Sequence, residues 1–102
     1  MTVKSQLNAC RDSIMAGMRA ATRGATPNER AGKVLRACLD LVEHMARQSD
    51  TVTTAEVGTT LAVLEQALAE LENEAVTSNA VLIALQNAIG RLQSLRAEIA
   101  AK

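Results

Sequence analysis

The chain has 102 residues, of which 48% are hydrophobic, although it contains no Phe, Tyr or Trp. Its 11 Lys and Arg residues balance its 11 Asp and Glu residues, so the neutral chain has no general attraction for nucleic acid or anionic membranes. A chain of this length is expected to fold as one helical domain, residues 1–102, with a core of aliphatic side chains.

Two amphipathic helices are predicted in the first half of the chain, over about residues 2–23 and 27–48. Apolar residues recur there at intervals of three or four, which is the spacing of one helical face. The inward positions of the first helix are Val3, Leu7, Cys10, Ile14, Met18 and Ala21, and those of the second are Ala31, Val34, Leu35, Cys38, Leu41, Val42 and Met45.

The turn between these helices carries the strongest local signals in the chain. Gly24 stands where a left-handed residue commonly ends a helix. Thr26 and Glu29 have the spacing of a capping box, and Pro27 stands at the first helical position, where proline is favoured. The second helix is therefore predicted to begin at Pro27.

Two further helices are predicted over about residues 54–75 and 79–101. Thr53 and Glu56 form a second possible capping box before the third helix. The apolar residues of both helices form a seam like that of a coiled coil. This seam contains Leu61, Leu64, Leu68, Leu71, Leu82, Leu85, Ile89 and Leu92. The fourth helix is apolar over more than one seam, which favours contact with two neighbours.

The join between the third and fourth helices allows two architectures. Neither Gly nor Pro interrupts residues 59–89, so one helix over 54–101 would give a helical hairpin plus one long C-terminal helix in a coiled-coil-like dimer. Ser78 and Asn79, however, are good N-cap residues, and Thr77 is a mediocre helix former. A break there gives four helices of similar length, and we expect an all-α, antiparallel up-down four-helix bundle.

Each predicted helix contains one interior glycine, at a cost of ~1 kcal/mol relative to alanine. The four positions are Gly17, Gly32, Gly58 and Gly90. A close approach between two helices would offset this cost. The alternative is that some of these glycines are surface positions of no consequence.

Opposite charges gather at two turns of the predicted bundle. Residues 1–50 carry eight Lys and Arg against five Asp and Glu, a net charge of +3, and residues 51–102 carry −3. The basic tip consists of Arg19, Arg23, Arg30, Lys33 and Arg36, and the acidic cluster consists of Glu65, Glu70, Glu72 and Glu74. In an up-down bundle both lie at one end, so they are expected to compensate each other. The alternative is that the basic tip binds an acidic partner or nucleic acid.

The sequence indicates no cofactor and no metal site. Cys10 and Cys38 are expected to share a core layer, either as two buried thiols or as a redox-sensitive disulfide. The longest apolar run is six residues, 80–85, too short to span a membrane, and the N-terminus lacks the apolar stretch of a signal peptide. A cytoplasmic location without membrane contact is therefore expected.

The only histidine suggests a signalling alternative. His44 is followed three residues later by the cation Arg47 on a bundle helix. This pattern resembles the histidine phosphotransfer (HPt) domains of two-component signalling. The resemblance implies that His44 accepts a phosphoryl group and that Arg47, usually Lys in the family, balances its charge. Gln48 departs from the family pattern, which has a small Gly or Ala there.

The preferred functional hypothesis is a protein-interaction module without enzymatic activity. It would be a small adaptor, a chaperone of a secretion or phage system, or a protein inhibitor, acting by helix–helix packing along the leucine seam. Its partner is expected to be another protein or a second copy in a homo-oligomer. The alternatives are the phosphotransfer domain through His44 and a nucleic-acid-associated protein using the basic turn 19–36, which the missing aromatics disfavour.

Overall fold

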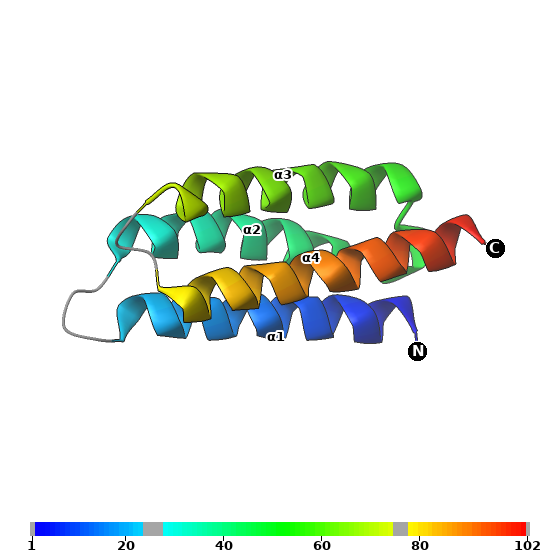
Figure 1. Ribbon diagram of the computed structural model, residues 1–102. Coiled ribbons are helices and arrows are strands. Elements are labelled where there is room, and N and C mark those ends of the chain that lie inside the picture. Colours follow the sequence, from blue (N-terminus) through cyan, green and yellow to red (C-terminus); the bar gives the residue numbers. More distant parts are fainter. Residues whose placement is uncertain (1, 24–27, 75–77, 102) are drawn as a thin grey trace.

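The structure is a computed structural model that describes residues 2–23, 28–74 and 78–101. It contains four long helices, which are α1 (Val3–Thr22), α2 (Glu29–Arg47), α3 (Thr54–Glu72) and α4 (Asn79–Ala100). A short 3₁₀ helix, η1 (Ser49–Thr51), precedes α3. Successive helices run in opposite directions in a rod of 46 × 21 × 18 Å (Figure 1). The predicted all-α four-helix bundle is confirmed.

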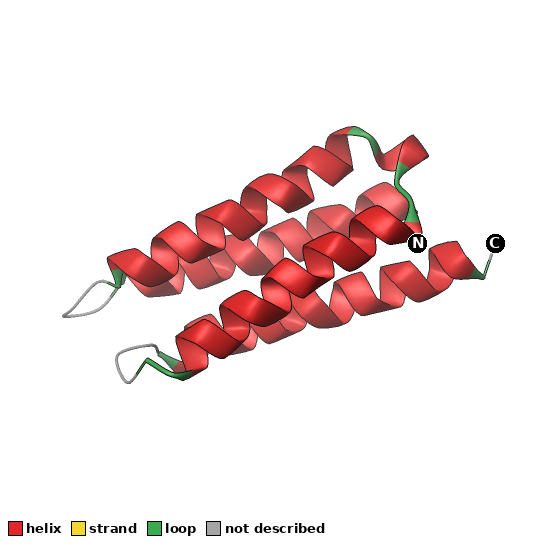
Figure 2. Cartoon of the chain, turned by 90° about the horizontal axis from the view of Figure 1, so that it is seen from above, coloured by secondary structure: helices red, strands yellow, loops and turns green. Residues whose placement is uncertain are grey.

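The four helices are not packed equally closely. α1 lies against both α2 and α4 and makes its most extensive contacts with α4. Among the neighbouring helix pairs, α2 and α3 make the least extensive contacts. The start of α1 and the end of α4 lie at the same end of the bundle, as Figure 2 shows from above. The first and last helices of the chain, α1 and α4, are therefore neighbours in the bundle.

Side-chain caps determine where the helices begin. Thr2 Oγ1 accepts a hydrogen bond from the Ser5 N–H at 3.0 Å, and Thr53 Oγ1 accepts one from the Glu56 N–H at 3.2 Å. These bonds satisfy amide groups that have no partner within the first helical turn. The predicted start of α3 is thereby confirmed.

The predicted start of α2 was wrong by two residues. Asn28 is the N-cap, and its side-chain oxygen accepts a hydrogen bond from the Ala31 N–H at 3.0 Å. The backbone of Asn28 is extended, with φ −98° and ψ 90°, so the helix begins only at Glu29. Asn is as good an N-cap as Ser or Thr, and here it takes the place assigned to Thr26. The predicted cap at Gly24 and the residues Thr26 and Pro27 lie outside the described residues.

The break between α3 and α4 is confirmed, and the alternative of one long helix is wrong. α3 ends at Glu72, three residues earlier than predicted, and α4 begins at Asn79. Ser78 has extended backbone angles, and its hydroxyl accepts a hydrogen bond from the Val81 N–H at 3.4 Å. This cap stabilises a new helix start, which a continuous helix would have to forgo.

The core consists of aliphatic side chains and the two cysteines, as the composition requires. One prediction for α2 was wrong, because Leu41 is 38% exposed whereas Leu39 is 4% exposed. α2 packs against both α1 and α3, so its buried face is wide enough to include Leu35, Leu39 and Val42 together. The sequence pattern alone does not show on which side of a stripe the second neighbour lies.

Only one of the four glycines allows a close helix contact. A Cβ atom on Gly17 would lie 3.0 Å from the Ala84 Cβ and 3.3 Å from Leu35 Cδ1. A Cβ on Gly32 or Gly90 would have no neighbour within 4 Å, and one on Gly58 would meet only the Arg96 side chain at 3.9 Å. Gly17 is thus the residue that lets α1 approach α4 so closely.

We predict opposite effects for alanine at Gly17 and at Gly32. Gly17→Ala should lower the free energy of unfolding by about 1–3 kcal/mol, because Ala84 is held by its helix backbone and α4 must shift. Gly32→Ala should raise it by about 1 kcal/mol, since alanine is the better helix former and nothing blocks it. Urea denaturation followed by circular dichroism measures both values. Equal stabilisation by the two substitutions would contradict a tight contact at Gly17.

Candidate functional site

The leucine seam lies mostly inside the chain's own bundle. Of its eight residues, six are buried, and Leu68 and Leu82 are partly buried against the core. The buried six are Leu61, Leu64, Leu71, Leu85, Ile89 and Leu92. An interface that used these six side chains would require the bundle to open.

The basic tip and the acidic cluster lie at the same end of the bundle, and one ion pair joins them. Arg30 Nη1 is 2.9 Å from Glu74 Oε1. Within α2, Arg36 Nε is 3.3 Å from Asp40 Oδ1. Both arginine side chains are about two-thirds exposed, so these pairs contribute at most about 1 kcal/mol each. Two of the five cations of the basic tip therefore have carboxylate partners.

His44 lies on the surface, one turn before the end of α2. It lines a shallow groove of about 420 Å³ between α2 and α3, together with Glu56 and Thr59. Arg47, the cation that would balance a phosphoryl group, is 3.7 Å from Glu43 and so has an anionic neighbour already. The imidazole of His44 is therefore exposed, but the cation nearest to it in the predicted motif is already paired with a carboxylate.

The two cysteines are free thiols in the core. The Cys10 thiol donates a hydrogen bond to the Ala88 carbonyl at 3.5 Å. Burial raises the pKa of Cys10 from 9.0 to about 12, while Arg91 lowers it and the neighbouring Cys38 raises it further. Burial likewise raises the pKa of Cys38 to about 11. Both thiols are thus protonated and unreactive at neutral pH.

The exposed face of α4 lies outside the leucine seam. This α4 face consists of Ala80, Ile83, Gln86, Asn87 and Gly90, all of which are exposed. Ile83 is 55% exposed, more than any other large hydrophobic side chain in the described residues. The sequence contains no charged residue between Glu74 and Arg91, so this solvent-facing surface has no charge at all.

A shallow groove of about 650 Å³ runs beside the α4 face, between α4 and α1. Most of the groove is lined by small side chains. These are Ala9, Ala16 and Ala20 from α1 and Ala80 and Ala84 from α4, and Ile83 lies beside them. Asp12 and Arg91 are its two charged residues, one from each helix. The groove exists because α1 and α4 approach closely and carry few long side chains there.

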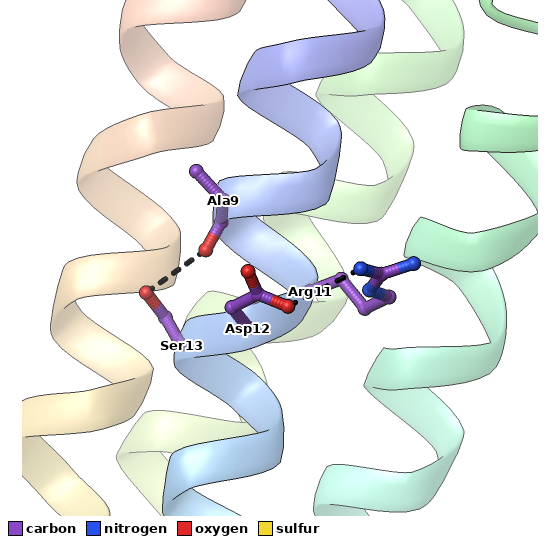
Figure 3. A network of polar contacts seen from close by, with 4 residues as sticks. All are labelled: Ala9, Arg11, Asp12 and Ser13. Carbon is purple, nitrogen blue, oxygen red and sulfur yellow. Dashed lines mark hydrogen bonds and ion pairs between the residues drawn. The ribbon is translucent and has the colours of Figure 1, made fainter.

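The polar groups of α1 beside this groove are partly satisfied within α1. The Ser13 hydroxyl donates to the Ala9 carbonyl at 3.2 Å, and the Arg11 guanidinium is 3.3 Å from the Asp12 carboxylate (Figure 3). Figure 3 shows Ser13 and Ala9 on the side of α1 that faces α4, while Arg11 extends toward α2. Because the Ser13 hydroxyl already donates its hydrogen bond within α1, an apolar group can bind beside it in the groove.

The groove becomes polar toward the chain termini. A second depression of about 510 Å³ shares Asn87 and Arg91 with the first and extends to Ser94 and Glu98. The buried Gln6 side-chain amide donates to the Glu98 carboxylate and ties α1 to α4 at this end. The surface between α1 and α4 thus changes from apolar to polar along the bundle.

The comparisons assign the chain to no known group of proteins. No protein-family model, no curated protein and no solved structure matches it significantly. Among the described residues, no three His, Cys, Asp or Glu side chains come together as a metal site would require. Within the same residues, no helix combines the length and the apolar character needed to cross a membrane.

We predict that truncation of the leucine seam destabilises the fold. Leu85→Ala should lower the free energy of unfolding by about 2–5 kcal/mol, because it leaves a cavity at a fully buried position. Leu82→Ala, at a partly buried position of the same seam, should cost clearly less. Urea denaturation measures the two values. Equal, small losses would indicate that the seam is not the core of the isolated chain.

We also predict that stability falls at alkaline pH because of the cysteines. Their pKa is higher in the folded chain than in the unfolded one, so above about pH 9 only the unfolded chain loses these protons. The free energy of unfolding should then fall by about 1.4 kcal/mol per pH unit for each thiol up to about pH 11. The double variant Cys10→Ala, Cys38→Ala keeps all lysines and should lack this slope. The same slope in both proteins would rule out the thiols as its cause.

Proposed function

We propose that the chain is a non-enzymatic protein-binding module that acts through the α4 face and the adjoining groove. The observation that carries the proposal is the exposure of Ile83 on a helix surface without charge. The centres of protein interfaces are depleted of charged residues and enriched in apolar ones, whereas free helix surfaces normally carry charges.

The energetics favour burial of this surface by a partner. Ile83 is 55% exposed, so its burial by a partner would contribute roughly half of the about 1.5–3 kcal/mol that full burial of an isoleucine is worth. The alanines of the groove and Gly90 allow another backbone to approach closely, as small residues do where helices pack. A helix of a partner fits such a surface best, because its side chains fill a shallow groove between two helices.

The adaptor, chaperone and inhibitor roles all depend on one accessible surface of this kind. In each of them the chain holds a segment of another protein without chemical change. The leucine seam supports this function indirectly, because it keeps α1 and α4 in place beneath the surface. The phosphotransfer and nucleic-acid alternatives gain no support from the geometry at Arg47 or at the basic tip.

The test compares equivalent substitutions of two exposed β-branched residues on different helices. Ile83→Gln should abolish capture of the native partner from a lysate of the host, with little change in the free energy of unfolding. Val63→Gln is the matched control, since Val63 is a β-branched residue on α3 that is 36% exposed. It should leave capture intact. Capture that survives Ile83→Gln, or that fails equally in both variants, would contradict binding through the α4 face.

A further inference from the structure

We propose that the α4 face and its groove bind a second copy of the chain, in a symmetric dimer with its twofold axis parallel to the bundle. This inference rests on the proposed function and names its partner. Two observations favour a second copy over a foreign helix. The surface lacks charge except for one Asp and one Arg, and these two residues complement each other across such an axis.

The positions of Asp12 and Arg91 along the bundle axis, which we call their heights, follow from the register of α1 and α4. Gln6 contacts Glu98, so it marks one level of the antiparallel pair. Asp12 lies six residues further along α1, and Arg91 lies seven residues back along α4. At 1.5 Å per residue the two therefore differ in height by only about 1.5 Å.

Rotation about a twofold axis parallel to the bundle leaves every residue at the same height along the axis. It reverses the side-by-side order of α1 and α4. α1 of one copy then faces α4 of the other, again as an antiparallel pair. Asp12 of each copy faces Arg91 of the other, which gives two equivalent ion pairs at the edge of the interface. Among the described residues, Arg91 takes part in no ion pair, and Asp12 pairs only with its neighbour Arg11. The Asp12 side chain is still 68% exposed, so both groups are accessible to a second copy.

The apolar parts of the two copies also match in this arrangement. Gly17 and Ala84 are in contact within one copy and so lie at one height. Ile83 therefore faces the stretch of α1 around Ala16 and Ala20 in the second copy, where small side chains leave room for it. Gly90, where a Cβ atom would have no neighbour within 4 Å, lies on the same exposed surface. A zero net charge places no general repulsion between two copies.

Sedimentation equilibrium of the full chain tests the dimer. We expect a dimer at high micromolar concentration, a monomer for Ile83→Gln and a dimer for Val63→Gln. Asp12→Arg and Arg91→Asp should each weaken self-association about tenfold or more, because each places two pairs of like charges in the interface.

A mixture of the two charge variants decides whether the contact is between chains. In a mixed dimer the two substituted side chains face each other in one pair, and the native Asp12 and Arg91 face each other in the second. Both pairs then join opposite charges. Asp12→Arg mixed with Arg91→Asp should therefore dimerise close to the wild-type affinity, although neither does alone. An effect within one chain cannot give this result. A mixture that stays monomeric would overturn the proposed pairing.

The two proposals can fail separately. A wild-type chain that is monomeric at high micromolar concentration overturns the dimer. If its partner capture is still lost in Ile83→Gln, the protein-binding function stands and the partner is a different protein. If Ile83→Gln changes neither self-association nor capture, both proposals fail.

Discussion

The close approach of α1 and α4 is the constraint on which the rest of the structure depends. At Gly17 the space for a Cβ atom is taken by Ala84 and Leu35, so the two backbones pass each other with almost no side chain between them. In a chain without aromatic residues this is how burial is achieved, because many small contacts replace a few large ones. The buried Gln6 and its bond to Glu98 hold the same pair together near the chain termini.

The same constraint explains the candidate binding surface. When two helices come this close through small residues, their outer edges form a shallow trough lined by alanines rather than a ridge of long side chains. The close packing of α1 and α4 therefore also produces the groove in which we propose that another helix binds. A bundle held apart by large side chains would present longer, more mobile groups at this position, and their ordering would oppose binding.

Local signals in the sequence predict the helices and the charged end of the bundle, and they favour the break before Asn79 while leaving one long helix as the alternative. Each of these follows from local information, such as the spacing of apolar residues or a serine that caps a helix. The start of α2 was less certain, because Thr26 and Asn28 are both good N-caps and only geometry shows that Asn28 takes this role. The burial of Leu39 and the exposure of Leu41 depend on where the second neighbour of α2 lies, which no local pattern contains.

The candidate binding surface is not evident in the sequence for a similar reason. The sequence predicts a fourth helix that is apolar over more than one seam, but periodicity does not show which of its apolar residues remain exposed. In the structure the leucines that formed the obvious seam fill the interior, and Ile83 is left outside. The informative signal was the absence of charge over residues 75–90, which becomes meaningful only when one side of that stretch is known to face water.

A comparison of α4 with α2 shows why this absence matters. Both helices bury one apolar side in the same bundle, and both expose the other. The exposed side of α2 carries Arg36, Asp40 and Glu43 among its charges, as a helix with water as its only outer neighbour does. α4 carries none over its first three turns and exposes an isoleucine there instead. Within one small molecule, therefore, the outer side of α2 has the charges of a solvent-facing helix, and the uncharged outer side of α4 supports the proposal that another helix covers it.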